Sequence, residues 1–135
     1  MRILGIDYGS ARVGVALGDT ETKVASPWRV IANEDVEETI DRIGEISKQE
    51  HVERLVVGMP RPLADQVGES HQTREVKLFV DKLARLGLLI DEENETLSSA
   101  MAAKQAASMG ERKKRDDLAA TVILQSYLDR YVLPS

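Results

Sequence analysis

The order of strand-like and helix-like segments constrains the fold of this chain more than any other feature. Three short apolar segments come first, and their close spacing predicts an antiparallel meander of strands at residues 2–8, 12–18 and 22–31. Helices and strands then alternate, with helices expected at 34–49, 70–86, 98–109 and 116–131 and strands at 53–59 and 88–95. Asn33 is the expected cap of the first of these helices. The alternation of helices and strands favours parallel pairing. The sequence therefore predicts an α/β fold: a five-stranded mixed sheet, strand one near its centre, and helices on both faces.

Length and composition favour one domain that spans residues 1–135. The chain is 42% hydrophobic, enough for a core at this size. Its apolar segments are all shorter than the roughly 20 residues of a membrane span, and its first residues lack a secretory pattern. It has no cysteine, which excludes disulfides and thiolate metal sites. We expect a cytoplasmic protein without membrane contact.

The formal charge is −5, and its distribution matters more than its total. A basic run, Arg112, Lys113, Lys114 and Arg115, lies between Gly110 and Asp116, and we expect it to form a loop or an irregular turn before the last helix. Beside acidic residues, this local positive charge suits a phosphodiester substrate. The alternative is a solvated loop whose cations offset nearby acids.

Three acids require an explanation, and Asp7 is the first. It lies in an otherwise apolar strand, where a charged side chain is costly unless it is paired or binds a metal. It could equally cap the turn at Gly9 and Ser10. Glu95 ends the predicted fifth strand, and in open α/β sheets ligands collect at the carboxyl ends of parallel strands. Its alternative is an exposed position in an acidic turn with residues 91–93.

The third acid, Asp116, is expected to start the last helix, where an N-cap role would also explain it. Taken together, Asp7, Glu95 and Asp116 can meet at one end of a sheet, where a divalent cation would relieve their mutual repulsion. Mg²⁺ prefers such oxygen ligands, and a bound ion of this kind can activate water and polarise a phosphodiester. The two histidines, His51 and His71, are better explained as surface residues than as catalytic bases.

Four segments give the sequence a recognisable character: GIDYGSARVGVA at 5–16, VVGMP at 56–60 with Gly68 beyond it, ENETLSSAMA at 93–102 and DDLAATVILQSYLD at 116–129. In these the chain resembles the YqgF family, also called the RuvX family, of small ribonuclease H-like proteins related to the RuvC resolvase. The likeness spans nearly the whole chain. It implies a ribonuclease H-like fold and places the metal-binding acids of the family on Asp7, Glu95 and Asp116.

The resemblance also implies an activity, that of a metal-dependent nuclease using Mg²⁺ or Mn²⁺. The expected role is processing of the 5′ end of precursor 16S ribosomal RNA, with resolution of four-way DNA junctions as the alternative. Two residues depart from the family pattern: Asn94 replaces the usual Asp and Thr96 the usual Arg. The loop at 60–63 differs as well. These departures affect expected substrate contacts, whereas the metal-binding acids are kept.

Two other functions stay open on sequence grounds. GIDYGS also resembles the first phosphate loop of actin-like and sugar-kinase ATPases, although those enzymes enclose a nucleotide between two such domains. A non-catalytic nucleic-acid-binding module is the other. We further expect Arg12, at the start of the second strand, to contact substrate phosphate, unless it is a surface arginine paired with an acid. Structured RNA is the expected partner, and the protein is expected to be a monomer or weak homodimer.

Overall fold

The structure, a computed structural model, describes residues 1–59, 71–94 and 112–131, with the backbone alone described at 71–72, 94 and 112–117. Within these ranges the elements are, in chain order, β1 (Arg2–Asp7), β2 (Arg12–Asp19), β3 (Val24–Ala32), α1 (Val36–Gln49), β4 (Val52–Met59), α2 (His71–Leu83), the short 3-10 helix η1 (Ala84–Leu86), β5 (Leu89–Asn94) and α4 (Arg112–Arg130). The helix expected at 98–109 lies outside the described residues.

The five strands form one mixed sheet in the order β3-β2-β1-β4-β5. The first three pair antiparallel as a meander, and β4 and β5 extend the sheet from β1 in parallel. This arrangement confirms the predicted sheet with β1 at its centre. Because β1, β4 and β5 run in parallel, their carboxyl ends, at Asp7, Met59 and Asn94, share one edge of the sheet.

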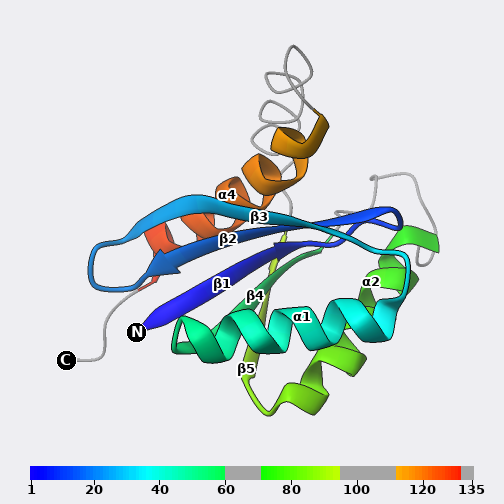
Figure 1. Ribbon diagram of the computed structural model, residues 1–135. Helices are drawn as coiled ribbons and strands as arrows, with labels where there is room; N and C mark the ends of the chain where they lie inside the picture. Colours follow the sequence, from blue (N-terminus) through cyan, green and yellow to red (C-terminus); the bar gives the residue numbers. More distant parts are fainter. Residues whose placement is uncertain (60–70, 95–111, 132–135) are drawn as a thin grey trace.

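Helices cover both faces of the sheet, as predicted (Figure 1). On one face, α1 and α2 enclose a core that includes Leu4, Ile6, Val15, Ile43 and Phe79. On the other face, α4 packs through Ala120, Ile123, Leu124 and Leu128. Among the described residues, none of the helices combines the length and apolar character needed to cross a bilayer.

The first helix was expected to begin at residue 34, and it begins two residues later, at Val36. The side chain that caps α1 is Asp35, which accepts a hydrogen bond from the Glu37 amide, whereas Asn33 was the expected cap. Asn33 is occupied elsewhere, because its amide group donates to the carbonyl oxygen of Gly9. Two neighbouring residues can serve as caps, and the tertiary contact decides between them.

The expected helix at 70–86 comprises α2 and η1, and it ends where the sequence predicts. Gly87 adopts the left-handed conformation, with φ of 75°, and its amide donates to the carbonyl of Ala84. Glycine adopts this conformation without steric cost, so the chain can turn directly into β5.

The last helix begins earlier than predicted. The backbone of 112–115 belongs to α4, so the expectation of a loop or irregular turn there is wrong. The physical reason is that lysine and arginine are good helix formers, and a run of four does not interrupt a helix. As a result, Asp116 is the fifth residue of α4, and it cannot be the N-cap of that helix.

Candidate functional site

The described site residue with the clearest position is Asp7, the last residue of the central strand. Its relative exposure is only 8%, although the other deeply buried positions of β1 are apolar. Withdrawing a carboxylate this far from water costs free energy that neighbouring groups or a cation must offset. Since the parallel strands end at this edge, Asp7 lies where open α/β sheets bind ligands.

Arg12 is the first residue of β2 and lies diagonally across from Asp7. The register pairs Asp7 with Gly14, and Arg12 is two residues from Gly14 on the same side of β2. Diagonal neighbours in an antiparallel pair have Cα atoms roughly 7–8 Å apart, within reach of a long side chain. The sheet therefore places a carboxylate and a guanidinium on one face, at its carboxyl edge.

That face is the one covered by α4. A Cβ atom added to Gly5 would meet the side chain of Leu124 and the carbonyl of Ala120, and one added to Gly18 would meet Leu128. Since Gly18 pairs with Ile3 near the start of β1, α4 runs antiparallel to β1. Its first turns are therefore directed toward the edge that holds Asp7 (Figure 1).

Asp116 precedes Ala120 by about one helical turn, so the α4 backbone carries it toward the carboxyl end of β1. Its side chain lies outside the described part of the structure, as do those of Lys113, Lys114 and Arg115. The structure thus removes the capping alternative for Asp116 and leaves the metal-binding hypothesis as a prediction.

Glu95 lies just beyond the described end of β5. The strand predicted at 88–95 is confirmed by β5 over its described residues, and the alternative of an acidic turn at 91–93 does not hold. Residues 91–93 belong to β5, and Glu93 is 7% exposed and pairs with Arg130 of α4. Buried parallel pairing with β4 extends the strand through these residues and so overrides their low strand propensity.

A second polar cluster, which the sequence did not predict, joins β4, β5 and α4. Arg54 donates to the hydroxyl of Tyr127 at 2.7 Å and to the carboxylate of Asp91 at 3.1 Å. The Tyr127 hydroxyl in turn donates to Asp91. Burial, and then this bond to Asp91, raise the pKa of Tyr127. The cluster fastens the edge strand β5 to α4.

Within the described residues, no group of three or more histidine and acidic side chains is close enough to hold a metal ion. Of the three predicted ligands, Asp7 alone has a described side chain. Its buried carboxylate is a hard oxygen donor, which suits Mg²⁺ or Mn²⁺.

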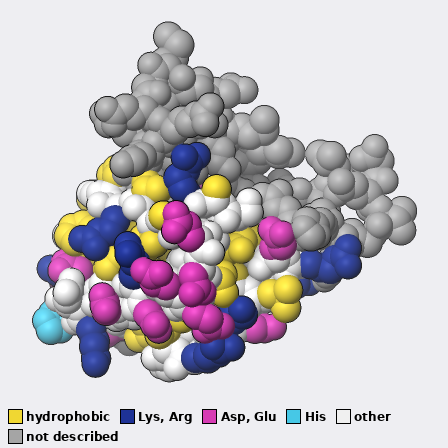
Figure 2. Space-filling model, turned by 45° about the vertical axis from the view of Figure 1, so that its right-hand side comes forward, with side chains coloured by type: hydrophobic (Ala, Val, Ile, Leu, Met, Phe, Trp, Pro, Cys, Tyr) yellow, Lys and Arg dark blue, Asp and Glu magenta, His cyan; other side chains and the backbone are white. Residues whose placement is uncertain are grey.

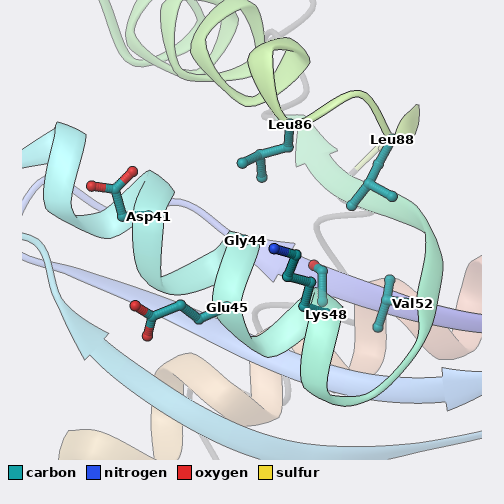
Figure 3. Close-up of a pocket in the computed structure, with 8 residues that line it drawn as sticks. Asp41, Gly44, Glu45, Lys48, Val52, Leu86 and Leu88 are labelled. Atoms are coloured by element: carbon teal, nitrogen blue, oxygen red, sulfur yellow. The ribbon is translucent and has the colours of Figure 1, made fainter.

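A separate groove of about 470 Å³ lies between the second half of α1 and residues 86–88 (Figure 3). It is lined by Leu86, Leu88 and Val52, with Asp41 and Glu45 at its rim. Val52 pairs with Arg2, so this groove lies at the opposite edge of the sheet from Asp7. Figure 2 shows acidic side chains gathered on the face that carries α1, which is unfavourable for contact with nucleic acid.

Comparison with known proteins adds the following. The sequence profile of the family described as "RuvX: Holliday junction resolvase" matches residues 1–130. A protein of Desulforudis audaxviator named "Putative pre-16S rRNA nuclease" is 40% identical over 135 residues, covering 96% of this chain and 94% of that protein. One of the same name from Desulforamulus reducens is 38% identical and covers 96% and 97%.

Solved structures resemble the fold at low sequence identity. RuvC of T. thermophilus in complex with a Holliday junction substrate has a TM-score of 0.60 at 14% identity, with 96% of this chain and 97% of that chain covered. The fowlpox virus Holliday junction resolvase has a TM-score of 0.57, also at 14% identity, with 97% and 100% covered. These similarities confirm the predicted ribonuclease H-like fold.

Proposed function

The chain belongs to the RuvX family, described as Holliday junction resolvases, and we propose that it is a nuclease that hydrolyses phosphodiester bonds with the help of a divalent metal ion. In this proposal Asp7, Glu95 and Asp116 hold the ion, Mg²⁺ or Mn²⁺. The observation that carries the proposal is the buried carboxylate of Asp7, at the carboxyl end of the central strand and on the face covered by α4.

The other two acids are proposed from the directions of their elements. The carboxylates of Asp91 and Glu93 both contact α4, so β5 presents two acids to this helix. Glu95 follows Glu93 by two residues in the sequence, the spacing of side chains on one side of a strand, and we propose that it supplies the second acid. The α4 backbone carries Asp116 toward the same edge. Asp7, Asp116 and Glu95 would then surround one metal ion.

When bound, the ion would supply an activated water and stabilise charge on the phosphodiester. The chain itself would orient the substrate. Arg12, on the same face as Asp7, is proposed to bind a substrate phosphate. Lys113, Lys114 and Arg115, in the first turn of α4, are proposed to attract the nucleic-acid backbone. The acidic face of α1 would direct nucleic acid toward this side.

We further propose that the substrate is the 5′ end of precursor 16S ribosomal RNA, and that the protein acts in the cytoplasm as a monomer or weak homodimer. The support is that two relatives of nearly the same length as this chain both carry the name "Putative pre-16S rRNA nuclease". The family description favours a four-way DNA junction as the second candidate substrate. Recognition would depend on shape and backbone, since aromatic residues make up only 4% of the chain.

A cleavage assay with Mg²⁺ or Mn²⁺ tests the proposal on a precursor rRNA fragment and on a four-way junction. We expect wild-type cleavage, and loss of it in Asp7→Asn, Glu95→Gln and Asp116→Asn. Glu38→Gln is the matched control, because it neutralises an exposed acid on α1. Equal cleavage by wild type and Asp7→Asn would refute the proposed site. Cleavage of the junction alone would reassign the substrate.

A binding titration tests the basic run. Contacts with phosphates release counterions, so affinity falls as salt rises. Replacing Lys113, Lys114 and Arg115 by alanine should flatten this dependence and raise KM, while metal binding is kept. Alanine also favours helix, so α4 should persist. Identical salt slopes for the wild type and the triple variant would show that the run is only solvated surface.

A further inference from the structure

We propose that Asn33 is a positioning residue that holds the loop between Asp7 and Arg12, an inference that rests on the function proposed above. The loop comprises residues 8–11 and connects the last residue of β1 to the first residue of β2. Asn33 belongs to neither strand. It follows β3 and precedes α1, so it connects this loop to a different layer of the fold.

Two hydrogen bonds join Asn33 to the loop. Its side-chain amide donates to the carbonyl of Gly9 at 2.9 Å, and its backbone N–H donates to the carbonyl of Ala11, also at 2.9 Å. A carbonyl only accepts, so the Asn33 side chain must present its NH₂ group to Gly9. One residue therefore fixes two alternate peptide groups of a four-residue loop.

The orientation of the Asn33 side chain is itself fixed from the helix. The Thr39 hydroxyl lies 2.9 Å from Oδ1 of Asn33 and 3.1 Å from the carbonyl of Asp35, and it can donate to either. Thr39 is almost fully buried, with 1% exposure. The first turn of α1 thus acts as a rigid support for Asn33, and through Asn33 for the loop.

The loop at 8–11 has little room to move. A Cβ atom added to Gly9 would lie 2.5 Å from the carbonyl oxygen of Arg12, so the chain folds tightly upon itself here. Gly9 thus lies close against the backbone of Arg12 on one side, and its carbonyl accepts from Asn33 on another. A shift of Gly9 toward Arg12 would therefore displace Arg12, and the loop also joins Gly9 to Asp7. These are the two described residues of the proposed site.

Asparagine suits this position because it supplies a donor and an acceptor on one short side chain. Aspartate would place a carboxylate oxygen against the Gly9 carbonyl, two acceptors facing each other. Alanine would leave the Gly9 carbonyl and the Thr39 hydroxyl without this partner. The proposal therefore assigns Asn33 an effect on turnover that exceeds its effect on folding.

The test compares Asn33→Ala with Asp35→Ala in the full chain, well below the unfolding temperature of each. Asp35→Ala is the matched control, because it removes the side-chain cap of the same helix two residues away and leaves the bond to Gly9 intact. Misplaced reacting groups can cost on the order of 10- to 100-fold in rate. We expect a fall of this size in kcat for Asn33→Ala with KM within about two-fold, and near wild-type kcat for Asp35→Ala.

Two further readouts separate positioning from stability. Backbone amide NMR signals of residues 8–12 should shift and broaden in Asn33→Ala and stay in place in Asp35→Ala. Thr39→Val should reproduce part of the loss in kcat, and Thr39→Ser, which keeps the hydroxyl, should restore it. Unchanged loop signals in Asn33→Ala, or equal effects of both alanine variants on kcat, would overturn the inference. If the wild type showed no cleavage beyond that of Asp7→Asn, the proposed function would be refuted instead. The NMR comparison would still decide whether Asn33 holds the loop.

Discussion

The two faces of the sheet are packed by opposite means. Under α1 and α2, branched side chains and the ring of Phe79 fill the space between the layers. Under α4 the sheet presents glycines, at Gly5, Gly18 and Gly58, and the side chains of α4 pack directly on the backbone of the strands. One face is filled by bulky side chains. On the other, Ile3 and Val56 alternate with glycines that let α4 approach the strands closely.

This difference decides which substitutions each face tolerates. A face filled by large side chains is damaged when one is removed, because a cavity remains. A face that depends on close approach is damaged when an atom is added, because the helix must move away. The second face matters more for the site, since α4 also carries Asp116. Four substitutions, and one control, test the comparison, and the four are given in order of decreasing effect.

The largest effect is expected for Phe79→Ala, on the α1 and α2 face. Phe79 is 1% exposed, and its ring lies 4.5 Å, centroid to centroid, from that of Tyr8. Removing a buried phenylalanine costs about 3–5 kcal/mol of unfolding free energy. Urea denaturation should show this loss. A cost below about 1 kcal/mol would mean that this core collapses around the gap, against the cavity argument.

Gly5→Ala tests the α4 face. The added Cβ would lie 2.7 Å from Cβ of Leu124 and 3.1 Å from the backbone carbonyl of Ala120, so rotation of a side chain cannot relieve the clash. The expected loss is about 1–3 kcal/mol by the same denaturation experiment.

Gly44→Ala is the matched control for Gly5→Ala, because Gly44 lies in α1 and its added Cβ would meet only the end of Leu86, at 3.0 Å. Within a helix, alanine is about 1 kcal/mol more favourable than glycine, so this variant should be as stable as the wild type or more stable. Equal losses at both glycines would show that α4 does not depend on close approach.

Tyr127→Phe tests how α4 is fastened to β5. The hydroxyl bonds to Asp91 and Arg54, and its loss should cost about 1 kcal/mol at neutral pH. Folding raises the pKa of Tyr127, so its hydroxyl stabilises the fold fully at any pH below the pKa of an unfolded tyrosine, about 10. This stabilisation is lost as the pH rises through the pKa of Tyr127 in the folded protein. The melting temperatures of wild type and variant should therefore converge above pH of about 10. Parallel curves would contradict the assigned pKa shift.

The smallest effect is expected for Arg42→Ala. Arg42 and Glu38 form an ion pair at 3.1 Å along α1, and both side chains are more than half exposed. Exposed pairs of this spacing contribute less than about 0.5 kcal/mol. Thermal unfolding at low and high salt should barely distinguish the variant from wild type. A loss comparable to that of Gly5→Ala would mean that surface charges, rather than the packing of the two faces, determine stability.

Sequence periodicity predicted the sheet and both helical layers, because these depend on hydrophobic patterns that persist along the chain. It misplaced the starts of two helices, where the deciding contacts are tertiary or the signal is ambiguous. Asn33 and Asp35 are both good caps, and only the distant Gly9 carbonyl distinguishes them. The charged run at 112–115 was interpreted as a loop from its polarity, although lysine and arginine favour helices.

The site could be predicted only in part for the same reason. Asp7 was conspicuous because a carboxylate interrupts an apolar strand, and the structure locates it at the end of the central strand. The cluster of Arg54, Asp91 and Tyr127 gave no local signal, because its members are separated by 36 to 73 residues along the chain. That Asp7, Glu95 and Asp116 lie together around one metal ion stays a prediction.

The late position of α4 in the chain determines when its face of the sheet can be covered during synthesis. Asp7 leaves the ribosome more than 100 residues before the helix that covers its face of the sheet. The side chain of Gln125 even completes the edge of β3, by accepting from the Ala25 amide at 3.0 Å. During synthesis, Ile3 and Val56 therefore have no covering helix until α4 has left the ribosome. The proposed nuclease site would thus stay incomplete until α4 has been synthesised, because both Asp116 and the cover of this face of the sheet come with that helix.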